Sequence, residues 1–490
     1  MGADPNPAGT EPSELLAARR RKLDALRADG IEPFPHAFAG VQPIEVVKAP
    51  FAGLAAGEET DVRARIAGRL AARRGQGKAA FLDLVDRSGR MQLHARVDVL
   101  GREALDRLLA LDLGDLIGVD GTVFRSRRGE LSLKVEAFAL LAKSLRPPPE
   151  KHHGLTDVET RFRQRELDLM ANDDARELFQ TRARAISATR RFLDERGFVE
   201  VETPVLQPIY GGALARPFTT HHNVLDRTLY LRIATELYLK RLIVGGLERV
   251  YELGKDFRNE GISFKHNPEF TMLEFYEAYA DYQDIAARCE QLVAHVAAEA
   301  GFEGPVSLDP PWRRETLADA IESRTGVAIL RDQGDRAALA EAMAERGLEV
   351  PGEESWAGLV DHLLSKHVEP TLQEPTFLLD YPVELSPFAK RHRSQPGLVE
   401  RFEAYVLGME IANAFTELND PDEQRARFED QRAAAAAGDE EAQPFDDAFL
   451  DALEHGMPPT GGIGIGIDRL VMALTGRHSI REVVLFPAMR

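Results

Sequence analysis

The sequence FRNEGISFKHNPEFTMLEFY, residues 257–276, predicts a β-hairpin with a long polar loop. Side chains alternate between two faces in the second strand, and one face carries Phe270, Met272, Glu274 and Tyr276. Arg258 lies at the start of the loop and Phe270 at its end. Because a guanidinium can hold phosphate and an aromatic ring can stack on a base, this hairpin can form one wall of a purine-nucleotide site. An amphipathic hairpin with a solvated loop explains the pattern equally well.

The run GGIGIGIDRL, residues 461–470, alternates glycine with isoleucine. Gly462, Gly464 and Gly466 would leave one face of a strand bare, so that a ligand could lie directly against the backbone. Asp468 can cap the helix that follows, which places Arg469 at a helix amino end, where phosphate binds favourably. The run is not a dinucleotide fingerprint, because GxGxxG would need glycine in place of Arg469, and it lacks the GK[ST] of a P-loop.

The segment ERFEAYVLGMEIANAFTELND, residues 400–420, predicts a second hairpin with Leu407 and Gly408 in the turn. Tyr405 would then face Glu410, and Glu403 would be a diagonal neighbour of Glu410 on the same face. Two such carboxylates suit a Mg²⁺ ion that bridges phosphates, although two solvated glutamates fit the same pattern.

Two more polar residues of this hairpin, Asn413 and Glu417, have the opposite parity to Glu410. All three side chains can therefore point into one pocket only if the strand contains a bulge or a bend. The alternation of residues does not reveal such an irregularity, so the hairpin predicts the pocket only conditionally.

The composition indicates a globular protein of at least two domains, with 490 residues, 44% of them hydrophobic and 29% charged. We expect a soluble, cytoplasmic protein without membrane association, because no apolar signal core or run of 18 apolar residues is found. The single cysteine, Cys289, excludes an internal disulfide framework and a multi-cysteine metal site. The net charge of −19 is uneven, since residues 1–150 contain 23 Lys and Arg against 21 Asp and Glu. Nucleic acid would therefore meet the smallest electrostatic cost in the N-terminal part.

Residues 61–142 contain five short alternating runs, with Gly-containing turns between them and one helical interruption near residues 102–110. The runs are 62–70, 80–84, 91–97, 116–124 and 131–138. This pattern predicts a small closed barrel of the OB-fold type. On such a barrel an exposed aromatic ring can stack on unpaired bases, and Phe81 beside Arg74 and Gln92 is a candidate, although Phe81 suits a core position equally well.

The expected domains follow from these patterns. Residues 1–60 form an N-terminal extension with a basic helix, residues 61–148 the barrel, and residues 149–490 a second domain with a helical insertion at about 300–375. The proline-rich LRPPPE, residues 145–150, is a stiff linker. The adjacent His221 and His222 lack a spaced second ligand, so we do not expect zinc. Glu236 lies at the start of a predicted helix, where a carboxylate can cap the helix or bind a cation.

Taken together, these motifs resemble the class II aminoacyl-tRNA synthetases, and specifically the bacterial type of class II lysyl-tRNA synthetase. FVEVETP (198–204) is similar to motif 1, ERVYELGKDFRNEG through EFTMLEFY (248–276) to motif 2, and GGIGIGIDRL to motif 3. GGALARPF (211–218), HNPEFTMLEFY (266–276), FTELND (415–420) and LFPAMR (485–490) are similar to stretches of the lysine family. The resemblance runs from about Arg63 to Arg490 and departs at Thr235, where the family usually has proline.

The resemblance implies an α+β protein with an N-terminal five-stranded OB-fold β-barrel that binds the anticodon. The class II synthetase catalytic domain would be an antiparallel sheet flanked by helices, and motif 1 would form a homodimer. The implied activity is the activation of L-lysine with ATP to lysyl-adenylate and pyrophosphate, followed by transfer of the lysyl group to the 3′ end of tRNA(Lys). Mg²⁺ would be the cofactor.

The resemblance also assigns roles to single residues. Arg258 would hold the α-phosphate and the lysine carboxylate, and Arg469 the γ-phosphate, as the two catalytic arginines. The other ATP contacts would be Glu260, His266 and Phe270, with Phe270 stacked on adenine. Glu403 and Glu410 would bind Mg²⁺. Glu274 would take the α-amino group of lysine, and the side-chain end would meet Glu236, Tyr276, Asn413 and Glu417. In the barrel, the anticodon would be bound by Arg74, Phe81, Gln92 and Glu130.

Physical chemistry agrees with these roles. Attack of a carboxylate on a phosphate builds negative charge without a protein nucleophile, so positioned arginines and Mg²⁺ can supply the catalysis. An aspartyl- or asparaginyl-tRNA synthetase is the nearest alternative, but it would need a cationic or an amide-binding pocket in place of an acidic one. Two other classes stay open: an enzyme that lysylates a protein or lipid, which would have little need of the barrel, and an inactive RNA-binding regulator, which would have no reason to keep both arginines.

Overall fold

The structure is a computed structural model that describes residues 14–75, 77–149, 155–352, 354–386, 388–436 and 443–489. Residues 1–13 of the expected extension and the last residue of the predicted linker, Glu150, lie outside these ranges. The chain divides into two compact units, Met1–Leu155 and Thr156–Arg490. Within the described ranges, no helix is both long and apolar enough to cross a membrane.

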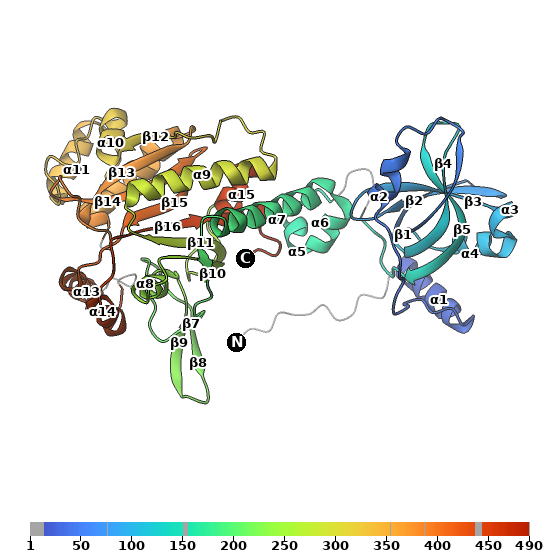
Figure 1. The fold of residues 1–490 in the computed structure, drawn as a ribbon, viewed down its shortest axis with the longest axis horizontal. Helices are drawn as coiled ribbons and strands as arrows, with labels where there is room; N and C mark the ends of the chain where they lie inside the picture. The colour runs from blue at the N-terminus through green and yellow to red at the C-terminus, as the bar shows by residue number, and fades with distance from the viewer. Residues whose placement is uncertain are drawn as a thin grey trace. The chain divides into compact units, whose positions relative to one another are not determined.

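The first unit contains a closed five-stranded barrel with the strand order β1-β2-β3-β5-β4 (Figure 1). Its interior is filled by alternate side chains such as Ile66, Leu82, Leu93 and Leu133, which are fully buried. The predicted OB-fold barrel is therefore confirmed. The elements of this unit are α1 (Glu14–Ala28), α2 (Ile44–Lys48), η1 (Ala49–Phe51), β1 (Glu59–Arg74), β2 (Ala79–Val85), β3 (Arg90–Arg96), α3 (Val97–Leu100), α4 (Arg102–Ala110), β4 (Leu116–Arg125) and β5 (Leu131–Ala142).

The predicted basic helix is α1, and it packs on the barrel unit. Arg19 is only 6% exposed. Its guanidinium donates hydrogen bonds to the carbonyl oxygens of Ser144 and Leu113, each at 3.0 Å. Leu23, one turn further along the helix, is buried as well. This face of α1 therefore holds the helix to the barrel, while the other arginines of the run are partly or fully exposed.

The second unit is built on an eight-stranded sheet with the order β12-β13-β14-β15-β16-β11-β10-β6 (Figure 1). All neighbours are antiparallel except the two edge pairs, β12 with β13 and β10 with β6. A separate three-stranded sheet has the order β7-β9-β8. The strands are β6 (Val199–Glu200), β7 (Leu206–Gln207), β8 (Thr219–His222), β9 (Arg227–Leu231), β10 (Arg249–Phe257), β11 (Glu269–Ala278), β12 (Arg313–Thr316), β13 (Thr376–Pro382), β14 (Leu398–Val406), β15 (Met409–Thr416) and β16 (Thr460–Gly466).

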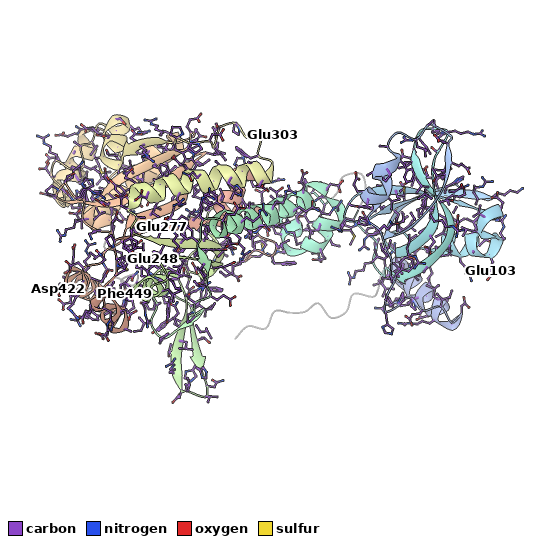
Figure 2. All side chains as sticks on the ribbon, viewed as in Figure 1. Glu103, Glu248, Glu277, Glu303, Asp422 and Phe449 are labelled. Carbon is purple, nitrogen blue, oxygen red and sulfur yellow. The ribbon has the colours of Figure 1, made fainter. Side chains whose placement is uncertain are left out.

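Helices α7, α9 and α15 cover one face of the large sheet and enclose its main core. The expected α+β fold, with an antiparallel sheet flanked by helices, is thereby confirmed. A smaller core packs α8 against α14, where Phe449 is labelled in Figure 2. The helices are α5 (Val158–Arg163), α6 (Arg165–Ala171), α7 (Asp173–Asp194), α8 (Glu236–Val244), α9 (Tyr282–Ala300), α10 (Leu317–Thr325), α11 (Arg336–Glu345), α12 (Trp356–Leu363), η2 (Leu364–Val368), η3 (Glu369–Thr371), η4 (Val383–Leu385), α13 (Pro421–Ala436), α14 (Asp447–Glu454), α15 (Ile467–Thr475) and α16 (Ile480–Val483).

The segment at about 300–375, expected to be a helical insertion, contains α10, α11, α12, η2 and η3. These helices have a hydrophobic core of their own, with Trp356 and Met343 buried in it. The segment also supplies the edge strand β12, which the sequence pattern did not indicate.

Both predicted hairpins of this unit are present. β10 and β11 pair without irregularity, from Arg249 opposite Glu277 to Phe257 opposite Glu269. β14 and β15 are joined by a turn at Leu407 and Gly408, with φ of 54° and 71°. Positive φ at both central residues is the geometry that matches the twist of two-residue hairpins.

Candidate functional site: a charged cleft on the central sheet

A cavity of about 350 Å³ lies on the face of the sheet opposite the main core. Strands β11 and β16 show why it forms there. Leu273 and Ile465 belong to the core, whereas Glu274 and Gly464, their neighbours along the strands, line the cavity. The glycine stripe predicted for residues 461–470 is therefore confirmed. Eleven of the twelve residues predicted for ATP, lysine and metal line the cavity: Arg258, Glu260, His266, Phe270, Arg469, Glu236, Glu274, Tyr276, Asn413, Glu417 and Glu410.

One end of the cavity is acidic and buried. Glu236, Glu274 and Glu417 are 5%, 6% and 1% exposed. Glu274 accepts a hydrogen bond from the Tyr276 hydroxyl at 3.2 Å and another from the Thr235 backbone N–H at 3.2 Å. Burial, with Asp256 and Glu236 nearby, raises the pKa of Glu274 to about 8. This end therefore suits a ligand that brings positive charge.

Lys240 of the protein itself lies among these carboxylates. It follows Glu236 by one helical turn, and its Nζ is 2.5 Å from Glu236 Oε1. It also forms an ion pair with Glu417 Oε2. Burial alone would lower the pKa of Lys240, but the two carboxylates raise it above its usual value. Burial raises the pKa of Glu417 to about 7, although Lys240 opposes the shift.

The opposite end of the cavity carries arginine, histidine and aromatic side chains. The guanidinium of Arg258 lies 5.1 Å from the centre of the Phe270 ring. Arg469 Nη1 donates to Glu410 Oε2 at 2.7 Å, and Arg469 Nη2 is 3.3 Å from His266 Nε2. Burial and the Arg469 charge lower the pKa of His266. A polyanion and a flat aromatic ring can be held side by side at this end.

A bulge in β15 brings its polar residues to one side. Tyr405 pairs with Glu410 but Ala404 pairs with Ala412, so Ile411 is an extra residue. Because of this bulge, the side chains of Asn413 and Glu410 lie on the same face and both line the cavity. The irregularity that the sequence required is therefore confirmed. Asn413 Oδ1 accepts a hydrogen bond from Arg401 Nε at 3.0 Å.

Glu403 is the predicted metal residue that does not line the cavity. It is 8% exposed and accepts hydrogen bonds from Arg401 Nη2 and the Tyr405 hydroxyl, each at 2.5 Å. Burial raises the pKa of Glu403, with Arg401 opposing and Glu410 adding to the shift. The cationic partners of Glu403 and Glu410 are Arg401 and Arg469, which both lie outside the run between the two carboxylates. The described residues contain no group of three or more side chains that could hold a metal ion.

The predicted cap at Asp468 is also wrong. Helix α15 begins at Ile467 after Gly466, without a side-chain cap. Asp468 instead accepts hydrogen bonds from the Thr271 backbone N–H at 2.7 Å and from Arg182 Nη1 at 2.6 Å. It thereby ties the start of α15 to β11 and α7, and Arg469 still lies in the first turn of the helix.

Two charged residues of the site, Lys240 and Arg401, were not predicted from the sequence. The spacing of four between Glu236 and Lys240 was a readable signal for an ion pair on one helix face. No pattern indicated that Lys240 would be buried, or that Arg401 would reach Glu403 and Asn413. His221, considered for zinc, lies 3.3 Å from Asp226 on the small sheet, and no further potential ligand joins it among the described residues.

In the first unit, the outer face of the barrel carries the predicted anticodon residues. Phe81 is partly exposed and stacks on His94, with ring centres 4.5 Å apart and planes 4° from parallel. Arg74 is paired with Phe81 across the strands and reaches Asp83 at 3.2 Å. The hydroxyl of Ser132 lies 3.0 Å from Gln92 Oε1 and 3.1 Å from the Glu130 carbonyl oxygen. The alternative that Phe81 is a core residue is therefore excluded.

Comparisons with known proteins agree in both units. Residues 157–490 match the family model described as tRNA synthetases class II (D, K and N), and residues 64–141 match the OB-fold nucleic acid binding domain. The lysine–tRNA ligase of Carboxydothermus hydrogenoformans is 51% identical over 489 residues, which is 98% of this chain and 99% of that protein. That of Moorella thermoacetica is 53% identical over 487 residues, or 98% of each chain. That of Synechococcus sp. is 51% identical over 486 residues, with 98% and 99% covered. The chain therefore belongs to the class II tRNA synthetases, in the family of the lysine–tRNA ligases.

Proposed function

We propose that the chain is a lysine–tRNA ligase, which activates L-lysine with ATP and transfers the lysyl group to the 3′ end of tRNA(Lys). The observation that carries this proposal is the division of one cavity into an acidic, buried end and an arginine-rich end. The first end suits the two ammonium groups of lysine, and the second suits the phosphates of ATP. The cavity itself therefore brings an amino acid and a nucleotide together.

In this proposal Arg258, at the arginine-rich end, neutralises both the lysine carboxylate and the α-phosphate. Attack of the carboxylate oxygen on the α-phosphorus forms lysyl-adenylate and releases pyrophosphate. Arg469 offsets the charge that develops on the leaving pyrophosphate, so the two arginines act as fixed electrostatic partners. Phe270 stacks on adenine, and Glu260 and His266 at the cavity rim contact the rest of ATP. No covalent bond to the protein is needed in these steps.

The residues present also fit a Mg²⁺ ion. Glu403 and Glu410 lie close enough for Glu410 to raise the pKa of Glu403, and a divalent cation would relieve this repulsion. Mg²⁺ commonly uses one or two carboxylates and completes its coordination with phosphates and water, which agrees with the small donor set here. When bound, it would supply Lewis-acid neutralisation of the phosphates. Arg401 and Arg469 form ion pairs with the two carboxylates.

The acidic end favours lysine over the other substrates of the group. The carboxylate of an aspartate substrate would meet Glu236 and Glu417, which are themselves buried, and like charges at such a site are strongly unfavourable. Asparagine would leave a carboxylate without a cation. Glu274 takes the α-ammonium group in this proposal, and Glu236, Tyr276, Asn413 and Glu417 surround the side-chain end.

For the barrel we propose that Arg74, Phe81, Gln92 and Glu130 bind the anticodon. Stacking of a base on a flat, partly exposed ring is a common mode of single-strand recognition, and Phe81 offers such a ring beside a basic side chain. Residues 61–148 would then serve as the anticodon-binding domain, residues 1–60 as its extension, and residues 149–490 as the catalytic domain.

We further propose a homodimer formed through motif 1 at residues 198–204. Its strand β6 lies at the edge of the large sheet, and Val199 and the nearby Leu206 are both 49% exposed. Exposed apolar side chains on an unpaired edge strand suit a protein interface. A cytoplasmic location is proposed with it, since the single cysteine, Cys289, is a buried free thiol. Light scattering across a concentration series tests the dimer.

The decisive experiment for the function is ATP–pyrophosphate exchange measured with each amino acid in turn, followed by charging of purified tRNA. We expect exchange with lysine and transfer to tRNA(Lys). Exchange with aspartate or asparagine in place of lysine would refute the substrate, and exchange without charging would refute tRNA as the acceptor.

A further inference from the structure

The ion-paired lysine at the acidic end has no role in the proposed reaction. Lys240 is 1% exposed, lies on α8, and contacts Glu236 of its own helix and Glu417 after β15. Its ammonium is the same chemical group as the one the pocket is proposed to bind. Because Lys240 is paired with the same two carboxylates that would bind the substrate, it determines how much negative charge remains for the substrate.

The charges at this end can be counted. Glu236 and Glu417 contribute two negative charges, and Lys240 contributes one positive charge. One negative charge is left over, which a single incoming ammonium neutralises. A neutral side chain would leave that charge buried without a partner, and a buried unpaired charge is strongly unfavourable.

We propose that Lys240 is a specificity-determining residue of this reaction: its ammonium neutralises one of the two buried carboxylates, so that the pocket accepts one cationic side chain. The inference rests on the proposed function and deepens it. It also explains the arrangement of Glu417, which uses Oε2 for Lys240. Its Oε1 is buried without a hydrogen-bond partner among the described residues and is the atom nearest to the bare backbone of Gly462. That oxygen is left for the substrate.

The other charged groups around Lys240 have partners of their own. Glu274 and Tyr276 of β11 bind each other at 3.2 Å, and Glu274 faces the α-ammonium position in the proposed function. Asp256 of β10 lies beside Arg232, whose Nε is 3.0 Å away. The balance between Lys240, Glu236 and Glu417 is therefore the one that decides the charge at the side-chain end.

The first test is Lys240→Met, which keeps the stem of the side chain and removes its charge. The pocket then holds two adjoining carboxylates, and one of them takes up a proton. The protonated carboxyl group can donate a hydrogen bond to a neutral ligand. We expect the ratio of kcat/KM for L-lysine to that for 6-hydroxynorleucine to fall by about tenfold. A rise of one unit in the pKa of a carboxyl group lowers its ionised fraction by about that factor when the pH is below the pKa. The ratio should recover at higher pH, and the KM for ATP should not change. Arg241→Met is the matched control, because Arg241 is the next residue on α8 and is exposed.

The second test compares Glu417→Gln with Glu417→Gln/Lys240→Met. In the single variant Lys240 cancels Glu236, and no charge is left for the substrate. The double variant removes one charge of each sign and restores a single negative charge. We expect it to bind lysine about tenfold more tightly than the single variant does, a non-additive gain that loss of packing cannot produce. This comparison also holds if Lys240→Met alone does not fold.

These outcomes separate the two proposals. Exchange with lysine by the unmodified enzyme reports on the function, and its absence would refute both. Lysine exchange by the unmodified enzyme, together with an unchanged lysine-to-analogue ratio in Lys240→Met, or with a double variant weaker than Glu417→Gln, would refute the role of Lys240 alone.

Discussion

Gly462→Ala is the substitution whose effect on the proposed lysine pocket can be worked out most directly. A Cβ atom added at Gly462 would lie 2.2 Å from Glu417 Oε1 and 2.3 Å from Tyr276 Cε1. Ordinary contacts begin at 3.4 Å, so one or both side chains must retreat by about 1 Å, and a misplacement of that size can cost about a hundredfold in rate. Glu417 is 1% and Tyr276 3% exposed, and both line the cavity, so a side chain that moves away from the added methyl changes the shape of the proposed lysine site. The added methyl should also destabilise the unit by about 1–3 kcal/mol through overpacking.

We expect kcat/KM for lysine in ATP–pyrophosphate exchange to fall by about a hundredfold, with the KM for ATP unchanged. Gly464→Ala is the control for the stability measurement, because its Cβ would find nothing closer than Met272 Sδ at 3.6 Å. Its melting temperature should stay that of the unmodified protein, whereas Gly462→Ala should melt earlier. A folded Gly462→Ala enzyme with an unchanged KM for lysine would refute the placement of Glu417 and Tyr276 in the lysine site.

Four further outcomes follow from the same geometry. Glu417→Gln should raise the KM for lysine by about a hundredfold or more and leave that for ATP unchanged, and equal losses for both ligands in titrations would contradict its role. Phe81→Ala should slow charging of limiting tRNA by about tenfold or more while exchange is spared, since a stacked base contributes about 1–3 kcal/mol. The Kd for lysine should fall as the pH rises from about 6 to 8, because Glu417 and Glu274, with pKa raised to about 7 and about 8, must lose protons to pair with ammonium groups; a flat profile in calorimetry would contradict this. Thr235→Pro removes a backbone N–H that helps to lower the pKa of Glu274, so it should shift that profile to higher pH, and an unshifted profile would show that the bond does not matter.

The sequence predicted those parts of the fold that depend on local alternation. Strands β2 and β3 of the barrel and the β10–β11 hairpin pair without a bulge, and Gly462, Gly464 and Gly466 mark the bare face of β16 directly. The sequence showed that β15 needs a bulge, but it did not show that the bulge lies at Ile411, because this position depends on how β15 pairs with β14. Thr235 shows the same limit: its N–H matters only because the fold brings Glu274 to it.

Charge partners were the least predictable part of the site. Arg469 and Glu410 are 59 residues apart in the chain, and no local pattern connects them. Arg401 is only two residues from Glu403, and in a strand this spacing indicates that the two side chains share a face. The spacing does not show that Arg401 also donates a hydrogen bond to Asn413 of the next strand. Sequence spacing therefore identifies the charged residues of this site better than it identifies their partners.

The pairing found in the site has a consequence for how substrates enter it. At the nucleotide end Arg469 is held by Glu410, and at the amino-acid end Lys240 is held by Glu236 and Glu417. In the proposed function, a phosphate that binds Arg469 makes Glu410 available to a cation, so each of these two charges exchanges one partner for another. An unpaired buried charge would cost several kcal/mol, and this exchange avoids such a state at the arginine-rich end. The proposed binding of lysine differs from that of ATP in this respect, because the lysine ammonium would complete a charge balance that Lys240 leaves one short, and no protein group would have to be released.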